Sequence, residues 1–141
     1  MLTDFKDEDF DNKIKNEDIS VIQFSAAWCG PCKALKPIMD KLAVEYKDKA
    51  GFYYADIEEG GINTGSAAGI RGVPTVIIYK KGVEVDRKDG GVPESHMKEF
   101  LEKNIEFKFK TSEQRYKDPV INSRSPWLRF MLLIASSILS L

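Results

Sequence analysis

The chain of 141 residues is long enough for one domain of ordinary size, and its 43% hydrophobic and 30% charged residues exclude global disorder. A net charge of −1 argues against a dedicated nucleic-acid binder, which needs a basic surplus to contact phosphates. Two cysteines and one histidine cannot build a disulfide-rich secreted scaffold or fill a four-ligand zinc site within one chain. We therefore expect no metal site and no nucleic-acid partner.

Charge is unevenly distributed along the chain. Residues 1–105 carry 15 basic and 19 acidic side chains, whereas residues 106–141 carry six basic and three acidic ones. We therefore predict a domain over 1–105, a polar basic linker over 106–126 and an apolar tail, expected to be helical, over 127–141. The first 18 residues are acidic and lack the apolar stretch of a signal peptide, which favours a cytoplasmic location.

Strand and helix patterns alternate along residues 1–105. In chain order, the pattern predicts a strand at 2–5, a helix at 7–15, a strand at 19–25, a helix at 31–46, a strand at 51–57, a short helix within 60–69, strands at 75–79 and 83–87, and a helix at 93–105. Pro37 lies inside the second helix, where we expect a kink. The alternation favours parallel strands, and the turn at Lys81-Gly82 adds an antiparallel hairpin. The sequence thus predicts an α/β domain with one mixed sheet and helices on both faces.

The chemistry-bearing motif is Trp28-Cys29-Gly30-Pro31-Cys32, which follows a predicted buried strand and opens a predicted helix. Two residues between the cysteines bring both sulfurs together across one helical turn, so they can form a reversible disulfide. Cys29 would lie at the helix N-terminus, where the dipole stabilises a thiolate, and Cys32 would be more buried. Two chemically inert buried cysteines, or half of a zinc site shared between two chains, are the alternatives.

Residues 1–105 resemble the thioredoxin family. The resemblance rests on residues 28–33 (Trp-Cys-Gly-Pro-Cys-Lys), residues 69–75 (Gly-Ile-Arg-Gly-Val-Pro-Thr), the Lys81-Gly82 turn and residues 98–101 (Lys-Glu-Phe-Leu). It implies a thioredoxin fold with a mixed five-stranded sheet and a C-terminal extension. It also implies a monomeric dithiol reductant of protein disulfides that binds no cofactor and receives electrons from NADPH through a thioredoxin reductase.

The resemblance further assigns residues to the active site. Cys29 would be the nucleophile and Cys32 the resolving thiol, supported by Gly30 and Pro31 between them. The peptide bond before Pro74 would be cis and lie against the cysteines, and a substrate strand would pair with the Val73 backbone.

The groove that receives the substrate would be lined by Trp28, Gly72, Val73, Pro74 and Gly90. Without the resemblance, Trp28 could be an aromatic residue of the core, and Gly90 could be merely part of a turn. Without the resemblance, an ordinary proline at the start of a strand is the preferred interpretation of Pro74.

Two positions depart from the family pattern. The family usually buries an acid beneath the second cysteine, but the matching position here is Gln23, which cannot accept a proton at useful pH. The family's nearby lysine corresponds to Tyr54, and the absence of the acid removes the reason for a buried lysine. We expect these departures to affect the rate at which Cys32 resolves a mixed disulfide.

The predicted tail at 127–141 has several interpretations. Its 15 residues would make a helix of ~22 Å, short of the ~30 Å apolar core of a membrane. The alternatives are interfacial membrane contact on the cytoplasmic side, a helix that packs on the domain or on a partner, and an extension without function.

The sequence therefore predicts a protein-disulfide reductase. The alternative is a thioredoxin-fold binding module or subunit whose role does not need the thiols. A Cys29→Ser/Cys32→Ser double variant separates the two hypotheses, because only the binding module would retain its function in complementation.

Overall fold

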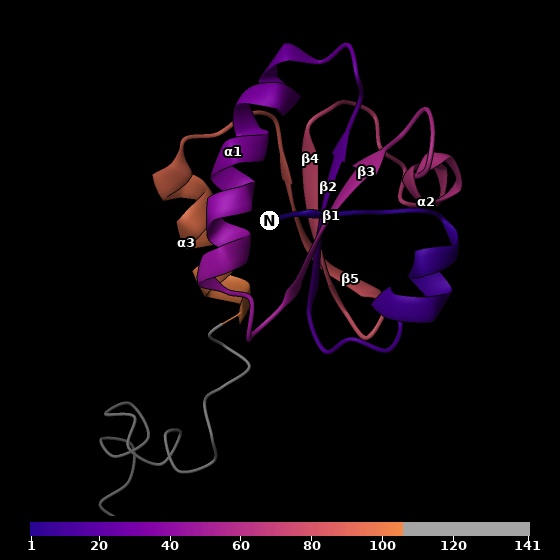
Figure 1. Cartoon of the computed structure of the whole chain (residues 1–141), viewed down its shortest axis with the longest axis horizontal. Helices are drawn as coiled ribbons and strands as arrows, with labels where there is room; N and C mark the ends of the chain where they lie inside the picture. Colours follow the sequence, from indigo (N-terminus) through magenta and orange to yellow (C-terminus); the bar gives the residue numbers. More distant parts are fainter. Residues whose placement is uncertain (106–141) are drawn as a thin grey trace, which may run out of the picture. The chain divides into compact units, whose positions relative to one another are not determined.

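The structure is a computed structural model that describes residues 1–105 (Figure 1). The predicted linker at 106–126 and apolar tail at 127–141 lie outside the described residues. The elements in chain order are β1 (Thr3–Asp4), η1 (Phe10–Ile14), β2 (Ser20–Ser25), α1 (Gly30–Glu45), β3 (Gly51–Asp56), α2 (Ile62–Ala67), β4 (Thr75–Lys80), β5 (Val83–Asp89) and α3 (Glu94–Ile105).

The five strands form one sheet in the order β1-β3-β2-β4-β5. Strands β1, β3 and β2 are parallel, whereas β4 runs antiparallel to β2, and β5 antiparallel to β4. The predicted mixed five-stranded sheet is therefore confirmed. Helices α1 and α3 cover one face, and η1 and α2 lie on the other (Figure 1).

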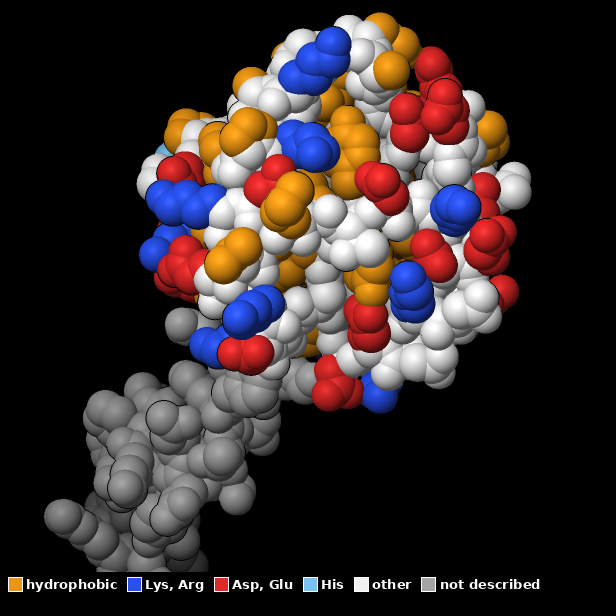
Figure 2. All heavy atoms as spheres, in the orientation of Figure 1, with side chains coloured by type: hydrophobic (Ala, Val, Ile, Leu, Met, Phe, Trp, Pro, Cys, Tyr) orange, Lys and Arg blue, Asp and Glu red, His pale blue; other side chains and the backbone are white. Residues whose placement is uncertain are grey.

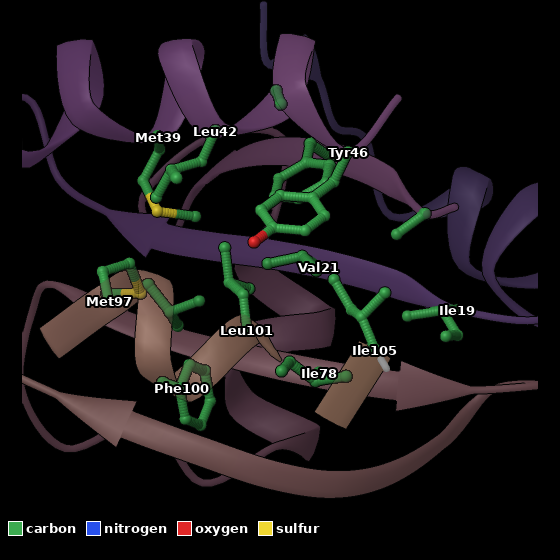
Figure 3. Close-up of a cluster of buried hydrophobic side chains, with 14 of the residues drawn as sticks. Ile19, Val21, Met39, Leu42, Tyr46, Ile78, Met97, Phe100, Leu101 and Ile105 are labelled. Atoms are coloured by element: carbon green, nitrogen blue, oxygen red, sulfur yellow. The ribbon is translucent and has the colours of Figure 1, made fainter. Parts of the chain in front are cut away.

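The face under α1 and α3 holds the larger apolar core. Met39 and Leu42 of α1, and Tyr46 directly after it, point toward Met97 and Leu101 of α3 across the sheet surface (Figure 3). Each Met and Leu in this set is fully buried, which matches the predicted apolar stripes of the two helices. Helix α1 runs from Gly30 to Glu45 and is not interrupted at Pro37.

The predicted helix at 7–15 is present over residues 8–14, but most of it has the wider winding of a π-helix. Its core, η1, is a π-helix in which the Lys15 N–H donates to the Phe10 carbonyl five residues earlier, at 3.0 Å. Ile14 is fully buried beneath it, and the Phe10 ring meets Tyr79 edge to face at 5.4 Å. Phe10 and Ile14 pack against the sheet. The spacing of four residues between them predicts a helix but not its π-helical winding.

All five strands differ from their predicted bounds by one or two residues at an end. Strand β3 ends at Asp56 rather than residue 57, and β5 continues past residue 87 to Asp89. The extension follows from pairing, because Lys88 and Asp89 lie opposite Val76 and Thr75 of β4. Among the helices within residues 1–105, none combines the length and apolar character needed to cross a membrane.

Candidate active site

The two cysteines lie where strand β2 gives way to helix α1. Cys29 is the N-cap of α1 with an extended backbone, and Pro31 occupies the first turn, where its missing N–H costs no hydrogen bond. Cys29 and Cys32 form a disulfide, with their Cα atoms 5.3 Å apart. The Cys32 N–H also donates to the Cys29 sulfur at 3.2 Å. A thiolate at Cys29 would therefore meet a backbone N–H at the positive end of the helix.

The two sulfurs differ in access. The Cys32 side chain is fully buried, whereas Cys29 retains 4% exposure, and Trp28 beside it is 67% exposed. Of the two cysteines, only Cys29 therefore retains any exposure. This asymmetry is the division of roles that the sequence predicts, and the assignment of each role remains a prediction.

Trp28 is held by a partner that the sequence analysis missed. Its indole N–H donates to the Glu58 carboxylate at 2.7 Å, and the Glu58 N–H donates in turn to the Asp56 carboxylate at 2.8 Å. Glu58 follows β3, so only the tertiary structure brings it to the motif. The tryptophan lies on the surface with its ring oriented by an acid, which disfavours its interpretation as a core aromatic.

The segment before β4 comes to the cysteines as predicted by the resemblance. The Val73–Pro74 peptide bond is cis. Val73 packs against the small cluster formed by Ala26 and the two cysteines. Loop contacts fix this segment: the Gly90 N–H donates to the Pro74 carbonyl at 2.8 Å.

A hollow of about 640 Å³ adjoins this segment. Four of the predicted groove residues line it, namely Gly72, Val73, Pro74 and Gly90. Trp28 is not among the residues that line this hollow. Gly90 has a φ of +85°, a backbone conformation that favours glycine. No atom lies within 4 Å of where its Cβ would be, so the space beside it is open.

Gln23 lies beneath the second cysteine. Its side chain is fully buried, and its amide Nε2 donates to the Cys32 carbonyl at 3.2 Å and to the Ser25 hydroxyl at 2.9 Å. The Gln23 Oε1 atom is buried without a hydrogen-bond partner in the part of the chain that the structure describes. Ser25 stands two residues along the same strand and therefore on the same face, a spacing that could have identified it from the sequence.

Tyr54 stands next to Gln23, because the two residues are register partners on β3 and β2. Its half-buried ring lies under Lys36 of α1, whose ammonium is 5.5 Å from the ring centroid. A lysine at position 54 would therefore come close to a second cation. The two positions that depart from the family pattern are thus direct neighbours on adjacent strands.

The surface that surrounds these elements is electrostatically mixed. Acidic and basic side chains are interleaved over the face shown in Figure 2, with apolar side chains between them. Within residues 1–105, no group of three or more His, Cys, Asp or Glu side chains could hold a metal ion. The chemical group of the described site is a pair of disulfide-bonded cysteines at a helix N-terminus.

Comparisons with known proteins agree with this geometry. The family model described as Thioredoxin matches residues 2–103. The chain is also 34% identical over 99 residues to thioredoxins of Staphylococcus aureus, such as those of strains Mu50 and COL. The alignment covers 70% of this chain and 93% of each of these relatives.

Proposed function

This chain belongs to the thioredoxin family and is a thiol–disulfide oxidoreductase, and from that premise we propose that it reduces protein disulfides through attack by Cys29 and resolution by Cys32. The observation that carries the proposal is the placement of the two sulfurs. Cys29 caps helix α1 and retains 4% exposure, whereas Cys32 lies one turn inside and is fully buried.

The reaction would proceed in two displacements. The Cys29 thiolate attacks one sulfur of the substrate disulfide, forms a mixed disulfide and releases the other substrate cysteine as a thiolate. Cys32 then loses its proton and attacks the Cys29 sulfur. This step forms the Cys29–Cys32 disulfide seen in the structure and releases the second substrate thiolate, so that two electrons have passed to the substrate.

The surroundings of the cysteines support binding of an extended substrate. Val73, before cis Pro74, lines a hollow in which Gly72 and Gly90 present no side chain; Arg71, Arg87 and Asp89 also line it. A substrate strand that pairs with Val73 would place its cysteine beside Cys29, and Trp28 would form an apolar wall. Gly30 and Pro31 would support the site by forming the first turn of α1.

The oxidised protein needs an electron source to turn over. We propose that a thioredoxin reductase supplies electrons from NADPH, that the protein itself binds no cofactor, and that it works as a monomer in the cytoplasm. Family membership supports this assignment. On the face of residues 1–105 shown in Figure 2, acidic and basic side chains are interleaved.

A disulfide reduction assay on an insulin-type substrate tests the proposal directly. Rapid reduction that depends on both NADPH and a reductase is the expected result. A redox titration should give a potential near that of thioredoxin, about −270 mV, whereas a value near −120 mV would indicate an oxidant and contradict the proposed direction.

Single cysteine variants test the roles of the two thiols. Cys29→Ser should lose at least about 1,000-fold in activity, because no surface thiolate remains to attack the substrate. Cys32→Ser should accumulate a mixed disulfide with the substrate, detectable by intact-protein mass spectrometry. Equal trapping by both variants would show that either thiol can attack and would contradict the assignment.

A further inference from the structure

A second hollow, of about 510 Å³, lies on the face of the sheet that η1 and α2 cover (Figure 1). Three segments that are distant in the sequence line it, namely positions within residues 7–11, within residues 63–68 and within residues 79–84. It shares no lining residue with the cysteine motif or with the hollow at Pro74. Its volume is in the usual range for a site that binds a small molecule. Disulfide reduction gives this hollow no role.

Two aromatic rings form part of the wall of this hollow. Phe10 and Tyr79 meet edge to face with their centroids 5.4 Å apart, and Tyr79 retains only 5% exposure. Ala67 and Ala68 of α2 also line the hollow, and their small side chains leave space beside the rings. Val83, which is 65% exposed, adds an apolar side chain from the β4–β5 hairpin. An aromatic group of a ligand therefore has an apolar surface to pack against.

The Tyr79 hydroxyl is an unused hydrogen-bonding group of this buried side chain. Within residues 1–105 no group forms a hydrogen bond with it. Buried polar groups of proteins almost always have a partner, so this hydroxyl is an exception. Burial and, to a smaller extent, the negative charge of Glu84 raise its pKa to about 12, so it stays protonated at neutral pH. Glu84 lines the same hollow, and a polar group of a ligand beside it would give the hydroxyl its partner.

The charged side chains that line the hollow are all acidic, namely Asp7, Asp11 and Glu84. Asp11 and Glu84 form ion pairs with Lys15 and Arg87, neither of which lines the hollow. Asp7 has no basic partner within residues 1–105, because its carboxylate is bound by the start of α2 instead. Its pKa lies below the ordinary value of 3.8, so Asp7 is charged at neutral pH. The hollow therefore favours a cationic ligand over an anionic one.

From these observations we propose that the hollow between η1, α2 and the β4–β5 hairpin binds a small aromatic amine, a role separate from disulfide reduction. The ring of the ligand packs against Phe10 and Tyr79. Its ammonium group donates a hydrogen bond to the Tyr79 hydroxyl and faces the negative charge of Asp7 and Glu84. A carboxylate in place of the ammonium would be repelled by these acids, and an alkylamine without a ring would leave the aromatic wall uncovered.

Three small molecules test this assignment: 2-phenylethylamine, 3-phenylpropanoate and butylamine. Each is titrated at pH 7 into the oxidised, ¹⁵N-labelled full chain, and the backbone amide chemical shifts are followed by NMR. We expect 2-phenylethylamine to bind with a Kd of about 1 mM or lower, and the other two molecules to bind at least about tenfold more weakly. The amides that shift should lie within residues 63–68 and 79–84 and not at residues 29–32.

Variants locate the ligand. Tyr79→Phe keeps the ring and removes the hydroxyl, so the Kd of 2-phenylethylamine should rise about fivefold. Ala67→Leu fills the space beside the rings and should raise the Kd at least about tenfold. Ser66→Leu is the matched control, because Ser66 is an exposed neighbour on α2 that does not line the hollow; its Kd should stay at the wild-type value. Denaturant melts of each variant confirm that binding is measured on folded protein.

Three results would overturn the proposal. One is the absence of saturable shifts with 2-phenylethylamine up to about 10 mM, and another is equal affinity for 3-phenylpropanoate, which would show that the acidic residues do not select the ligand. The third is wild-type affinity in both Tyr79→Phe and Ala67→Leu, which would place the ligand elsewhere. Because the hollow contains no residue of the cysteine site, these variants should reduce insulin at the wild-type rate, and failure of amine binding leaves the proposed reductase function standing.

Discussion

At the scale of single residues, the site departs from its family at Gln23. A neutral amide replaces an acid directly behind Cys32, where it donates to the Cys32 carbonyl and to Ser25. A carboxylate at this position would lie fully buried and could accept the proton of Cys32. The amide cannot, so the resolving thiol must transfer its proton to water or through a weaker relay.

We predict that Gln23→Asp speeds resolution near neutral pH and leaves the attack by Cys29 nearly unchanged. The same change should lower the free energy of unfolding by roughly 2–5 kcal/mol, because it buries a carboxylate without a partner. Stopped-flow turnover of a preformed mixed disulfide measures the first effect, and denaturant melts measure the second.

Two further variants interpret this result. Gln23→Asn has the shape of Gln23→Asp without the acid, so it should not speed resolution. Tyr54→Lys added to Gln23→Asp should recover part of the lost stability, because positions 23 and 54 are adjacent across the two strands. If Gln23→Asp changes neither rate nor stability, position 23 does not act on Cys32.

At the scale of elements, the short helix α2 depends on a residue far away in the sequence. Its N-cap, Gly61, has no side chain to cap the helix. The Asp7 carboxylate accepts hydrogen bonds from the Asn63 N–H at 3.1 Å, the Thr64 N–H at 2.9 Å and the Thr64 hydroxyl at 2.8 Å. Asp7 thus caps a helix that begins at Ile62, far along the chain.

This cap predicts a specific loss of stability. Asp7→Ala should cost about 1–2 kcal/mol, the usual range for removing a helix cap. Asp11→Ala is the matched control: Asp11 forms an ion pair with Lys15 on the surface, its side chain is 72% exposed, and its loss should cost less than ~0.5 kcal/mol. Urea melts at pH 7 compare the three proteins, and equal losses would contradict the capping role.

The same cap has a pH dependence. Burial raises the pKa of Asp7, but the hydrogen bonds from Thr64 and Asn63 outweigh burial and hold the pKa below its ordinary value of 3.8. A carboxyl with a lowered folded pKa contributes stability above its unfolded pKa and loses it as pH falls. The difference between wild type and Asp7→Ala should therefore shrink below pH 4.

At the scale of the whole molecule, two buried tyrosines link stability to alkaline pH. Burial and, to a smaller extent, a hydrogen bond to Glu17 raise the pKa of Tyr53 well above its ordinary value. Burial and, to a smaller extent, the negative charge of Glu84 raise the pKa of Tyr79 to about 12. Both rings line the core between the sheet and η1.

We predict that the domain loses stability as pH rises above about 10. A tyrosine whose folded pKa is raised contributes stability that is complete below its unfolded pKa, near 10, and is lost as pH rises toward the folded value. Urea melts at pH 8 and pH 11 measure the loss. At pH 8, Tyr53→Phe should lower the free energy of unfolding by about 1 kcal/mol, because its hydrogen bond to Glu17 is lost. Between pH 8 and pH 11, this variant should lose less stability than the wild type. An equal loss in both proteins would contradict the assignment to Tyr53.

The domain division gives a further prediction for the whole chain. A protein that ends at residue 105 should melt cooperatively and keep the disulfide reductase activity of the full chain within about twofold, because the family match ends at residue 103 and every site residue precedes residue 105. A loss of activity or of cooperative melting would show that residues 106–141 belong to the folded domain.

Sedimentation with anionic lipid vesicles tests the interfacial interpretation of the tail with the same pair of proteins. The full chain should bind the vesicles and the protein that ends at residue 105 should not, because only the full chain carries the basic linker and apolar tail. Equal binding would remove the membrane interpretation and leave the alternatives for residues 106–141.

The sequence by itself determined the family, the order of the elements and the position of the reacting cysteines, because these depend on local patterns. Strand and helix periodicity, the Cys-x-x-Cys spacing and the turn at Lys81-Gly82 each involve neighbours along the chain. The same reasoning placed Gln23 beneath Cys32, because the family frame supplied the long-range contact.

Only the tertiary structure decided the contacts between distant segments. The cap of α2 by Asp7 and the orientation of Trp28 by Glu58 each join residues more than 25 positions apart. The π-wound η1 has the same origin, since Phe10 and Ile14 pack on a sheet whose strands come later in the chain. Local spacing contains no information on such partners, because they meet only when the whole sheet has formed.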